Sequence, residues 1–299
     1  MRLCPLCRAA EGVADTEPLW PIGWRCDSCG HLVEVADGVP QYAAGLANSM
    51  TGMNPAAFDE IVRREEGNFW FEPRSRLLVG LADKFFPGAR RYLEIGCGTG
   101  AVLTPMASTR PWTRIVGSEI HPAGLVHARQ RLGTRAEFVQ MDARNIPART
   151  AFDLVGAFDV IEHIAEDKAV LEQIHRALLP GGGFLVAVPQ HPRLWSEIDD
   201  LSFHQRRYRR GELEGKLRAT NFEVLYSTSY TALLLPLMIA SRLFAGKNRQ
   251  DVGCREFDID PKLNAAMRFV LQGEVALTLR GISWPAGGSR VVVARKPSA

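Results

Sequence analysis

The sequence predicts an α/β protein with a doubly wound parallel sheet and a small module at its N-terminus. From residue 90 onward, short apolar runs typical of strands alternate with helical stretches, which indicates a parallel sheet covered on both faces. The first of these runs leads into a glycine-rich turn at residues 96–100 that opens the next helical stretch. Two Cys-x2-Cys pairs lie within the first 30 residues and indicate a separate metal-stapled unit.

The composition is that of an ordinary soluble globular protein. Of the 299 residues, 46% are hydrophobic and 23% charged, and the net charge of +3 does not require a nucleic-acid partner. The first ten residues lack the apolar core of a signal peptide, and no apolar run reaches the roughly 18 residues of a membrane span. We therefore expect a cytoplasmic protein without a transmembrane segment, in which cysteines are thiols or metal ligands.

The N-terminal cysteines predict a structural zinc site. Eighteen residues separate the two pairs, a spacing typical of zinc ribbons. Four thiolates complete the coordination sphere, so the zinc has no open position for catalysis. The alternatives are four buried cysteines without metal, and competition from His31, which is more simply explained as a solvated side chain. Residues 1–45 are the predicted ribbon, with Cys4, Cys7, Cys26 and Cys29 as its zinc ligands.

Residues 46–90 are expected to form a linker and two N-terminal helices, at residues 58–64 and 73–86. Between the helices lies the aromatic sequence Phe69-Trp70-Phe71. These rings could anchor the second helix in the core or form a flap over a cofactor, and the sequence favours neither.

Residues 91–299 are expected to form the main domain. Strands are predicted at residues 91–95, 114–117, 137–140, 152–158, 184–188, 223–230 and 291–294. Helices are predicted between them, at residues 100–108, 122–132, 167–178 and 211–219.

Three carboxylates at the ends of successive predicted strands characterise the ligand of the glycine-rich turn. Taken alone, the turn also fits a nicotinamide or flavin site, or no ligand at all. Glu94 precedes the glycines, Glu119 ends the second strand and Asp142 follows the third. Carboxylates there can accept hydrogen bonds from ribose hydroxyls and an adenine amino group, and they suit a cationic amino-acid end. They would repel a pyrophosphate, so we expect a sulfonium nucleoside.

The main domain resembles the class I S-adenosylmethionine-dependent methyltransferases, of the type 11/12-like group. The resemblance covers about residues 69–296 and rests on LEIGCGTG at 93–100, Glu119, MDA at 141–143, FDLVGAFDVIEHI at 152–164 and LLPGGGFLVAVP at 178–189. It implies a seven-stranded Rossmann-like sheet with an antiparallel last strand, and S-adenosylmethionine as cofactor. The implied cofactor-binding residues are Glu94, Gly96, Cys97, Gly98, Gly100, Glu119, Asp142, Ala143 and Phe158.

Three histidines are candidates for the catalytic residues. The resemblance puts His163 near the transferred methyl group, while His191 and His204 lie in a polar, aromatic loop after the fifth strand. That loop is similar to the substrate loop of bacterial enzymes acting on small metabolites, quinones or glycan-related compounds. An imidazole titrates near neutral pH and can act as a general base, although each histidine could instead make a structural hydrogen bond. The arginines at 206, 207, 209 and 210 suit an anionic acceptor or a solvated helix start.

Residues 231–288 are expected to form a helical insertion before the last strand. An apolar stretch covers 232–244, and Leu263, Met267, Val270, Leu271 and Leu277 are spaced along one helical face of 261–280. Buried core is the simplest expectation, and a lid, a homodimer face or a shallow membrane contact are the alternatives.

The predicted function is methyl transfer from S-adenosylmethionine to an oxygen, nitrogen or carbon of a small molecule, such as a metabolite, natural product or glycan-related compound. The enzyme's tasks are then alignment and, where needed, proton removal, and the displacement does not itself require a catalytic metal. The alternative is a zinc-containing methyltransferase of ribosomal RNA bases, for which nucleic acid would be the partner. A non-catalytic nucleoside-binding or zinc-ribbon interaction protein is a third hypothesis.

Overall fold

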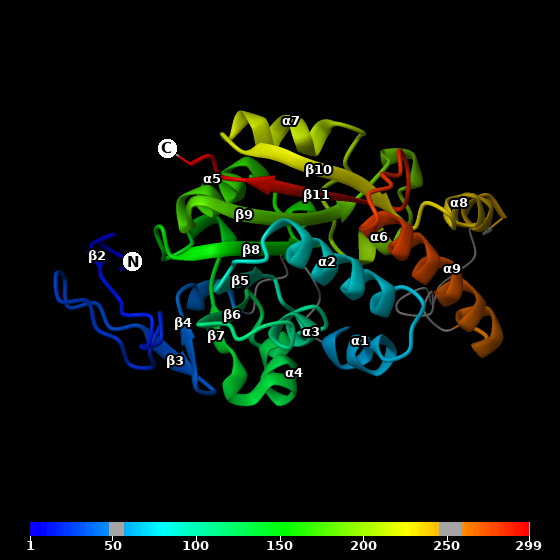
Figure 1. Ribbon diagram of the computed structural model, residues 1–299. Coiled ribbons are helices and arrows are strands. Elements are labelled where there is room, and N and C mark those ends of the chain that lie inside the picture. Colours follow the sequence, from blue (N-terminus) through cyan, green and yellow to red (C-terminus); the bar gives the residue numbers. More distant parts are fainter. Residues whose placement is uncertain (48–56, 245–258, 299) are drawn as a thin grey trace.

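A mixed sheet forms the centre of the molecule in the computed structural model, which describes residues 1–47, 57–244 and 259–298 (Figure 1). The strand order is β10-β11-β9-β8-β5-β6-β7-β4-β3. In chain order these strands are β3 (Glu34–Ala36), β4 (Val39–Gln41), β5 (Arg91–Ile95), β6 (Arg114–Glu119), β7 (Glu137–Gln140), β8 (Phe152–Phe158), β9 (Leu178–Pro189), β10 (Glu223–Tyr230) and β11 (Ser289–Arg295).

All seven strands predicted for the main domain are present, and their pairing has the expected sense. The pairs from β7 through β6, β5 and β8 to β9 are parallel. The last strand, β11, lies antiparallel between β9 and β10. The predicted doubly wound α/β fold with an antiparallel last strand is thus confirmed. The sheet is two strands wider than expected, because β3 and β4 from the N-terminal segment extend its β7 edge.

Helices cover both faces of the sheet (Figure 1). One face packs against α2 (Phe71–Phe85), α3 (Leu103–Ala107), α4 (Pro122–Leu132) and α9 (Pro261–Leu279). The other packs against α5 (Asp167–Ala177) and α7 (Glu212–Ala219). The remaining helices are α1 (Phe58–Glu65), α6 (Glu197–Leu201) and α8 (Leu235–Phe244). No helix of the described ranges is long and apolar enough to cross a membrane.

The N-terminal segment is joined to the sheet at β7. A short hairpin of β1 (Arg2–Leu3) and β2 (Ala10–Glu11) lies beside the loop that follows β7, where the Leu3 amide donates to the Pro147 carbonyl at 2.9 Å. Gln41 of β4 pairs with Gln140 of β7, and the Gln140 side chain exchanges hydrogen bonds with the main chain of Ala43 at 2.8 and 2.9 Å. The segment therefore packs directly on the strand that leads to Asp142.

The predicted apolar face of the C-terminal helix is wrong in part. In α9, the buried side chains are Leu271, Glu274, Val275 and Thr278, whereas Leu263 is 49% exposed. The buried residues of α9 all lie in its second half, where Leu279 approaches the Cα of Gly80 in α2 so closely that a β-carbon would meet it at 2.7 Å. The first half reaches α2 through an ion pair of Arg268 with Glu72 at 3.3 Å. Parts of the predicted linker and insertion, at residues 48–56 and 245–258, lie outside the described residues.

Candidate active site

The glycine-rich turn after β5 has a backbone that only glycine adopts readily. Gly96, Gly98 and Gly100 have φ values of 63°, 51° and 82°. A β-carbon on Gly96 would lie 2.4 Å from a methyl group of Val160, so a side chain there would have to displace Val160, which lies two residues after β8. Cys97 is buried, and its amide donates to the Ser118 carbonyl of β6 at 2.9 Å. The turn is therefore joined to the neighbouring strand β6 through a main-chain hydrogen bond.

Glu94, the carboxylate before the turn, is buried in the sheet and 2% exposed. It accepts a hydrogen bond of 2.9 Å from the Tyr92 hydroxyl. Burial raises the pKa of Glu94 to about 8, a shift that the Tyr92 hydrogen bond and the nearby Arg74 charge reduce only in part. A cation bound beside this carboxyl would stabilise its ionised form.

Glu119, at the end of β6, holds the turn in shape. One carboxylate oxygen accepts from the Gly98 amide at 3.1 Å, and the other accepts from the amides of Ile120 and His121. An ionised carboxylate has about four acceptor positions, so these bonds leave some capacity for a ligand hydroxyl. Burial raises the pKa of Glu119, opposed by these amides and by His121. Glu119 thus links the predicted ribose position to the glycine turn itself.

Asp142 and Ala143 begin a short 3-10 helix after β7. Asp142 is half-buried, caps the Arg144 amide at 2.8 Å and forms an ion pair with the Arg144 side chain at 2.9 Å. Ala143 is buried in the core under this turn. Phe158, at the end of β8, is 8% exposed, and its ring centroid lies 6.0 Å from Cζ of the Arg74 guanidinium. The predicted cofactor residues therefore lie at or just beyond the carboxyl ends of four parallel strands, β5 to β8.

Helix α1 covers the glycine turn, a contact that sequence reasoning missed. The Phe58 ring lies over Gly98 and Gly124, where added β-carbons would meet it at 3.6 and 3.0 Å. Glu65, at the other end of α1, accepts from the Thr99 hydroxyl and forms an ion pair with Arg131 at 2.7 Å. The aromatic sequence Phe69-Trp70-Phe71 instead starts α2, and Phe69 and Trp70 pack on the core. These two rings therefore anchor α2, the first of the two predicted roles.

His163 and His204 come together at the end of β8. Their rings are 4.7 Å apart and inclined at 74°. His204 Nδ1 lies 2.8 Å from a carboxylate oxygen of Asp199, and its Nε2 lies 4.0 Å from Glu162. Burial and the neighbouring His204 lower the pKa of His163 to about 3, so this imidazole is a poor proton acceptor at neutral pH. Glu162 was not among the predicted site residues, although it directly precedes His163.

His191 lies in the same loop but is held differently. Its backbone is left-handed, with a φ of 64°, and its amide donates to the Tyr208 carbonyl at 2.9 Å. The contact pins the start of the loop to the strand-like segment at Tyr208. Among the described residues, Nε2 of His191 has no hydrogen-bond partner, although it is buried.

Two of the four clustered arginines have partners within the protein. Arg206 forms an ion pair with Asp167 at 2.7 Å, and Arg207 one with Asp199 at 2.6 Å. Both line a surface groove of about 450 Å³ together with Trp195 and Arg209. The groove is basic, but the internal carboxylates neutralise much of the positive charge that was expected to attract an anionic acceptor.

The four N-terminal cysteines meet in one cluster. Their sulfur atoms all lie within 4.8 Å of one another, with Cys4 and Cys29 at 3.7 Å and Cys7 and Cys26 at 3.7 Å. Sulfurs bound to zinc at about 2.3 Å in a tetrahedron lie roughly 3.8 Å apart. The cluster therefore fits the predicted zinc ion and contains no disulfide.

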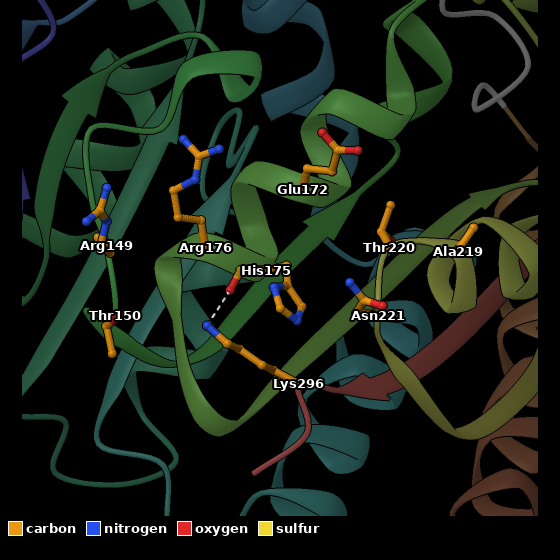
Figure 2. A pocket seen from close by; sticks show the side chains of 9 residues that line it. All are labelled: Arg149, Thr150, Glu172, His175, Arg176, Ala219, Thr220, Asn221 and Lys296. Atoms are coloured by element: carbon orange, nitrogen blue, oxygen red, sulfur yellow. Dashed lines mark hydrogen bonds between the residues drawn. The ribbon is translucent and has the colours of Figure 1, made fainter. Parts of the chain in front are cut away.

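A second, larger cavity lies away from these residues. Figure 2 shows it lined by Arg149, Arg176, His175 and Lys296, with Lys296 hydrogen-bonded to the His175 carbonyl at 2.8 Å. Its volume is about 510 Å³. It lies beside Thr150 and Lys296, near the amino end of β8 and the carboxyl end of the antiparallel strand β11. Ligands of open α/β sheets bind at the opposite end of the strands, beyond the carboxyl ends of the parallel strands.

The chain is similar to S-adenosylmethionine-dependent methyltransferases in its fold and in the sequence around the glycine turn. Residues 93–184 match the model of the methyltransferase domain family. A probable S-adenosylmethionine-dependent methyltransferase of Mycolicibacterium smegmatis is 30% identical over 53% of this chain and 61% of that protein. A ubiquinone biosynthesis O-methyltransferase of Ruegeria pomeroyi is 32% identical over 44% of this chain and 50% of that protein. The chain thus spans about half the length of these two relatives.

The fold also matches solved structures. A phosphoethanolamine N-methyltransferase 2 of Haemonchus contortus, in complex with S-adenosyl-L-methionine, superposes with a TM-score of 0.56 at 19% identity. The match covers 85% of this chain and 59% of that one. At this identity the likeness concerns the fold alone.

Proposed function

We propose that this protein transfers the methyl group of S-adenosylmethionine to a nucleophilic oxygen, nitrogen or carbon of a small molecule. The observation that carries the proposal is the cradle at the ends of β5 and β6. Three glycines with left-handed backbone, Gly96, Gly98 and Gly100, lie there between the buried carboxyls of Glu94 and Glu119. Without β-carbons the turn would let a nucleoside approach the main chain, and the two carboxyls would offer acceptors for its hydroxyl and ammonium groups.

The cradle residues divide the cofactor between them. Glu94 would face its ammonium group, Glu119 its ribose hydroxyls, and Asp142 its adenine amino group. Phe158 and Ala143 would give apolar contacts beside the sulfonium and the adenine. When bound, S-adenosylmethionine supplies a methyl group on an already activated sulfur. The remaining task of the protein is to align the acceptor with the carbon of this methyl group.

The acceptor is proposed to react beside His163 and His204. A carbon–oxygen, carbon–nitrogen or carbon–carbon bond forms while the carbon–sulfur bond breaks, and the bonding electron pair stays on sulfur. A proton leaves the acceptor where its nucleophilic atom carries one. His204 is the best placed of the three candidate histidines to assist, because Asp199 fixes its ring at 2.8 Å. His191 lies in the same loop and is a further candidate for removing this proton.

The N-terminal cluster is proposed to hold one structural zinc ion. The sulfur spacings of 3.7 Å in two pairs support this. Zinc would fix a segment that is too short to bury a core of its own. Reduced thiolates suit a reducing compartment such as the cytoplasm.

A small-molecule acceptor is favoured over RNA because one relative acts in ubiquinone biosynthesis and others are trans-aconitate 2-methyltransferases. The test is to incubate purified protein and S-adenosylmethionine carrying an isotopically labelled methyl group with a fractionated cell extract. Mass spectrometry should find label in a small metabolite and none in the RNA fraction. Label in ribosomal RNA would favour the alternative function, and label in neither fraction would count against both.

A further inference from the structure

A second group of potential metal ligands lies on the acceptor side of the sheet, far in sequence from the cysteines. Glu162 and His163 belong to a 3-10 helix (Ile161–His163) directly after β8, and His204 comes from the loop after α6. Each contributes one ligand atom, and these three atoms lie within 4.8 Å of one another. Ligands held 2.0–2.2 Å from an ion lie about 3–4 Å apart, so small side-chain rotations would close the site.

The carboxylate of this group is buried without a partner. Glu162 is 0% exposed, and neither of its carboxylate oxygens has a hydrogen-bond partner among the described residues. Nδ1 of His163 is also buried and unpartnered there. Burying a polar group without a hydrogen-bond partner destabilises the folded state, and burying a charged group does so more strongly. Unpartnered buried atoms on two adjacent residues of the group indicate that a ligand completes the site.

The neighbouring positive side chains already have other partners. Arg74 forms an ion pair with Asp159 at 2.5 Å, and Arg207 one with Asp199 at 2.6 Å. His204 Nε2 is 4.0 Å from Glu162, too far for a hydrogen bond. None of these groups therefore compensates the Glu162 carboxylate by direct contact.

Asp199 orients His204 as the outer residues of metal sites do. It lies 2.8 Å from Nδ1, so the other ring nitrogen, Nε2, faces Glu162. A histidine ligand usually donates its second N–H to a carboxylate in this way. The loop is also tied to the helix by the Gln205 amide, which donates to the Glu162 carbonyl at 2.8 Å. The two segments are thus held together even without the side chains of the group.

We propose that Glu162, His163 and His204 bind a divalent transition-metal ion next to the methyl acceptor. Two imidazoles and one carboxylate form a ligand set used for Zn²⁺, Fe²⁺ and Mn²⁺. Three protein ligands leave coordination positions open, which an oxygen of the acceptor would occupy. This last step rests on the proposed function and implies transfer to oxygen. The oxygen–carbon bond forms, the carbon–sulfur bond breaks with its electrons left on sulfur, and the hydroxyl proton passes to solvent.

Metal binding is testable without knowing the acceptor. The full chain, with its zinc content measured first, is titrated separately with Mn²⁺ and with Zn²⁺ by calorimetry. One ion per chain should bind in addition to the cysteine-bound zinc. Glu162→Gln should weaken this binding by more than about a hundredfold, and Asp199→Asn by about 10–100-fold, because Asp199 acts through His204. Glu172→Gln, an exposed glutamate of α5, is the matched control and should bind like the wild type.

The outcomes separate this proposal from the function itself. S-adenosylhomocysteine is titrated into the same samples, and its affinity should be unchanged in Glu162→Gln. Melting curves without added metal should show Glu162→Gln at least as stable as the wild type, since the variant replaces a buried carboxyl without hydrogen-bond partners by a neutral amide of the same shape. A wild type that binds S-adenosylhomocysteine but neither metal at a second site would overturn the proposal and leave the methyltransferase function standing. Equal metal affinity in wild type and Glu162→Gln would also overturn it.

Discussion

At the scale of single residues, Glu94 couples the stability of the fold to pH. Its folded-state pKa of about 8 exceeds the ordinary value of 4.5, so the folded protein holds the proton more tightly than the unfolded chain. The contribution of Glu94 to stability is therefore greatest below about pH 4.5 and falls until about pH 8. Relative to the wild type, Glu94→Gln should become more stable as pH rises through this window. Urea unfolding of the wild type and Glu94→Gln at pH 5, 7 and 9 measures the difference in their free energies of unfolding. A difference that does not change with pH would contradict the assigned burial of Glu94.

A second residue-scale prediction concerns His204. If it acts on the acceptor, as a base or as a metal ligand, His204→Ala should lower turnover of the identified substrate at least about a hundredfold. The affinity for S-adenosylhomocysteine should stay nearly constant, because His204 is not among the proposed cofactor-binding residues. His175→Ala, in the remote cavity of Figure 2, is the control. Unchanged turnover in His204→Ala would remove this residue from the site.

Some site residues could be predicted from the sequence and others could not. Glu94, Glu119 and the glycines could be proposed from the sequence because each lies at or next to the carboxyl end of a recognisable strand. Glu162 was missed because a glutamate beside a histidine looks solvent-exposed in a sequence. Its significance comes from complete burial and from the approach of His204, about 40 residues away. Similarly, the partners of Arg206 and Arg207 lie in segments whose contact no local pattern shows.

At the scale of elements, α1 is expected to stabilise the cofactor turn. Phe58 is 4% exposed and lies over Gly98 and Gly124. Phe58→Ala should lower the free energy of unfolding by about 3 kcal/mol, in the range for a large buried aromatic side chain. Phe269→Ala on α9, where the ring is 77% exposed, should change it by less than about 0.5 kcal/mol. Chemical denaturation measures both, and equal effects would contradict the assigned position of α1.

The strands were easier to predict than the helix contacts. Four strands, β5, β7, β8 and β10, have the predicted bounds, because apolar runs bounded by turn residues are local signals. The face of α9 was wrong in part because the buried residues of this helix all lie in its second half, so the spacing of apolar residues over the whole helix did not describe a single buried face. No pattern in the N-terminal segment indicated that β3 and β4 would join the sheet. Their pairing with the sheet depends on two residues that lie 99 positions apart, Gln41 and Gln140.

At the scale of the whole molecule, the ribbon and the cofactor site share β7. The cysteines lie in the segment whose strand β4 ends at Gln41, and Gln140 opposite it is two residues from Asp142. The Cys26→Ser variant should therefore lose zinc and have a lower melting temperature. Its affinity for S-adenosylhomocysteine should also fall, but by less than its stability does. Ser28→Ala, in the same turn, is the control. Elemental analysis that finds no zinc in wild type purified without chelators would contradict the zinc site.

The central claim is that the cradle binds an adenosyl sulfonium cofactor. Calorimetric titration of S-adenosylhomocysteine into the purified protein tests it most directly. We predict one binding site per chain, and its loss in Gly98→Val, because a branched side chain conflicts with the φ of 51° at that position. Melting curves of the variant establish that it folds. Absence of binding to the wild type, or tighter binding of a nicotinamide dinucleotide, would contradict the account.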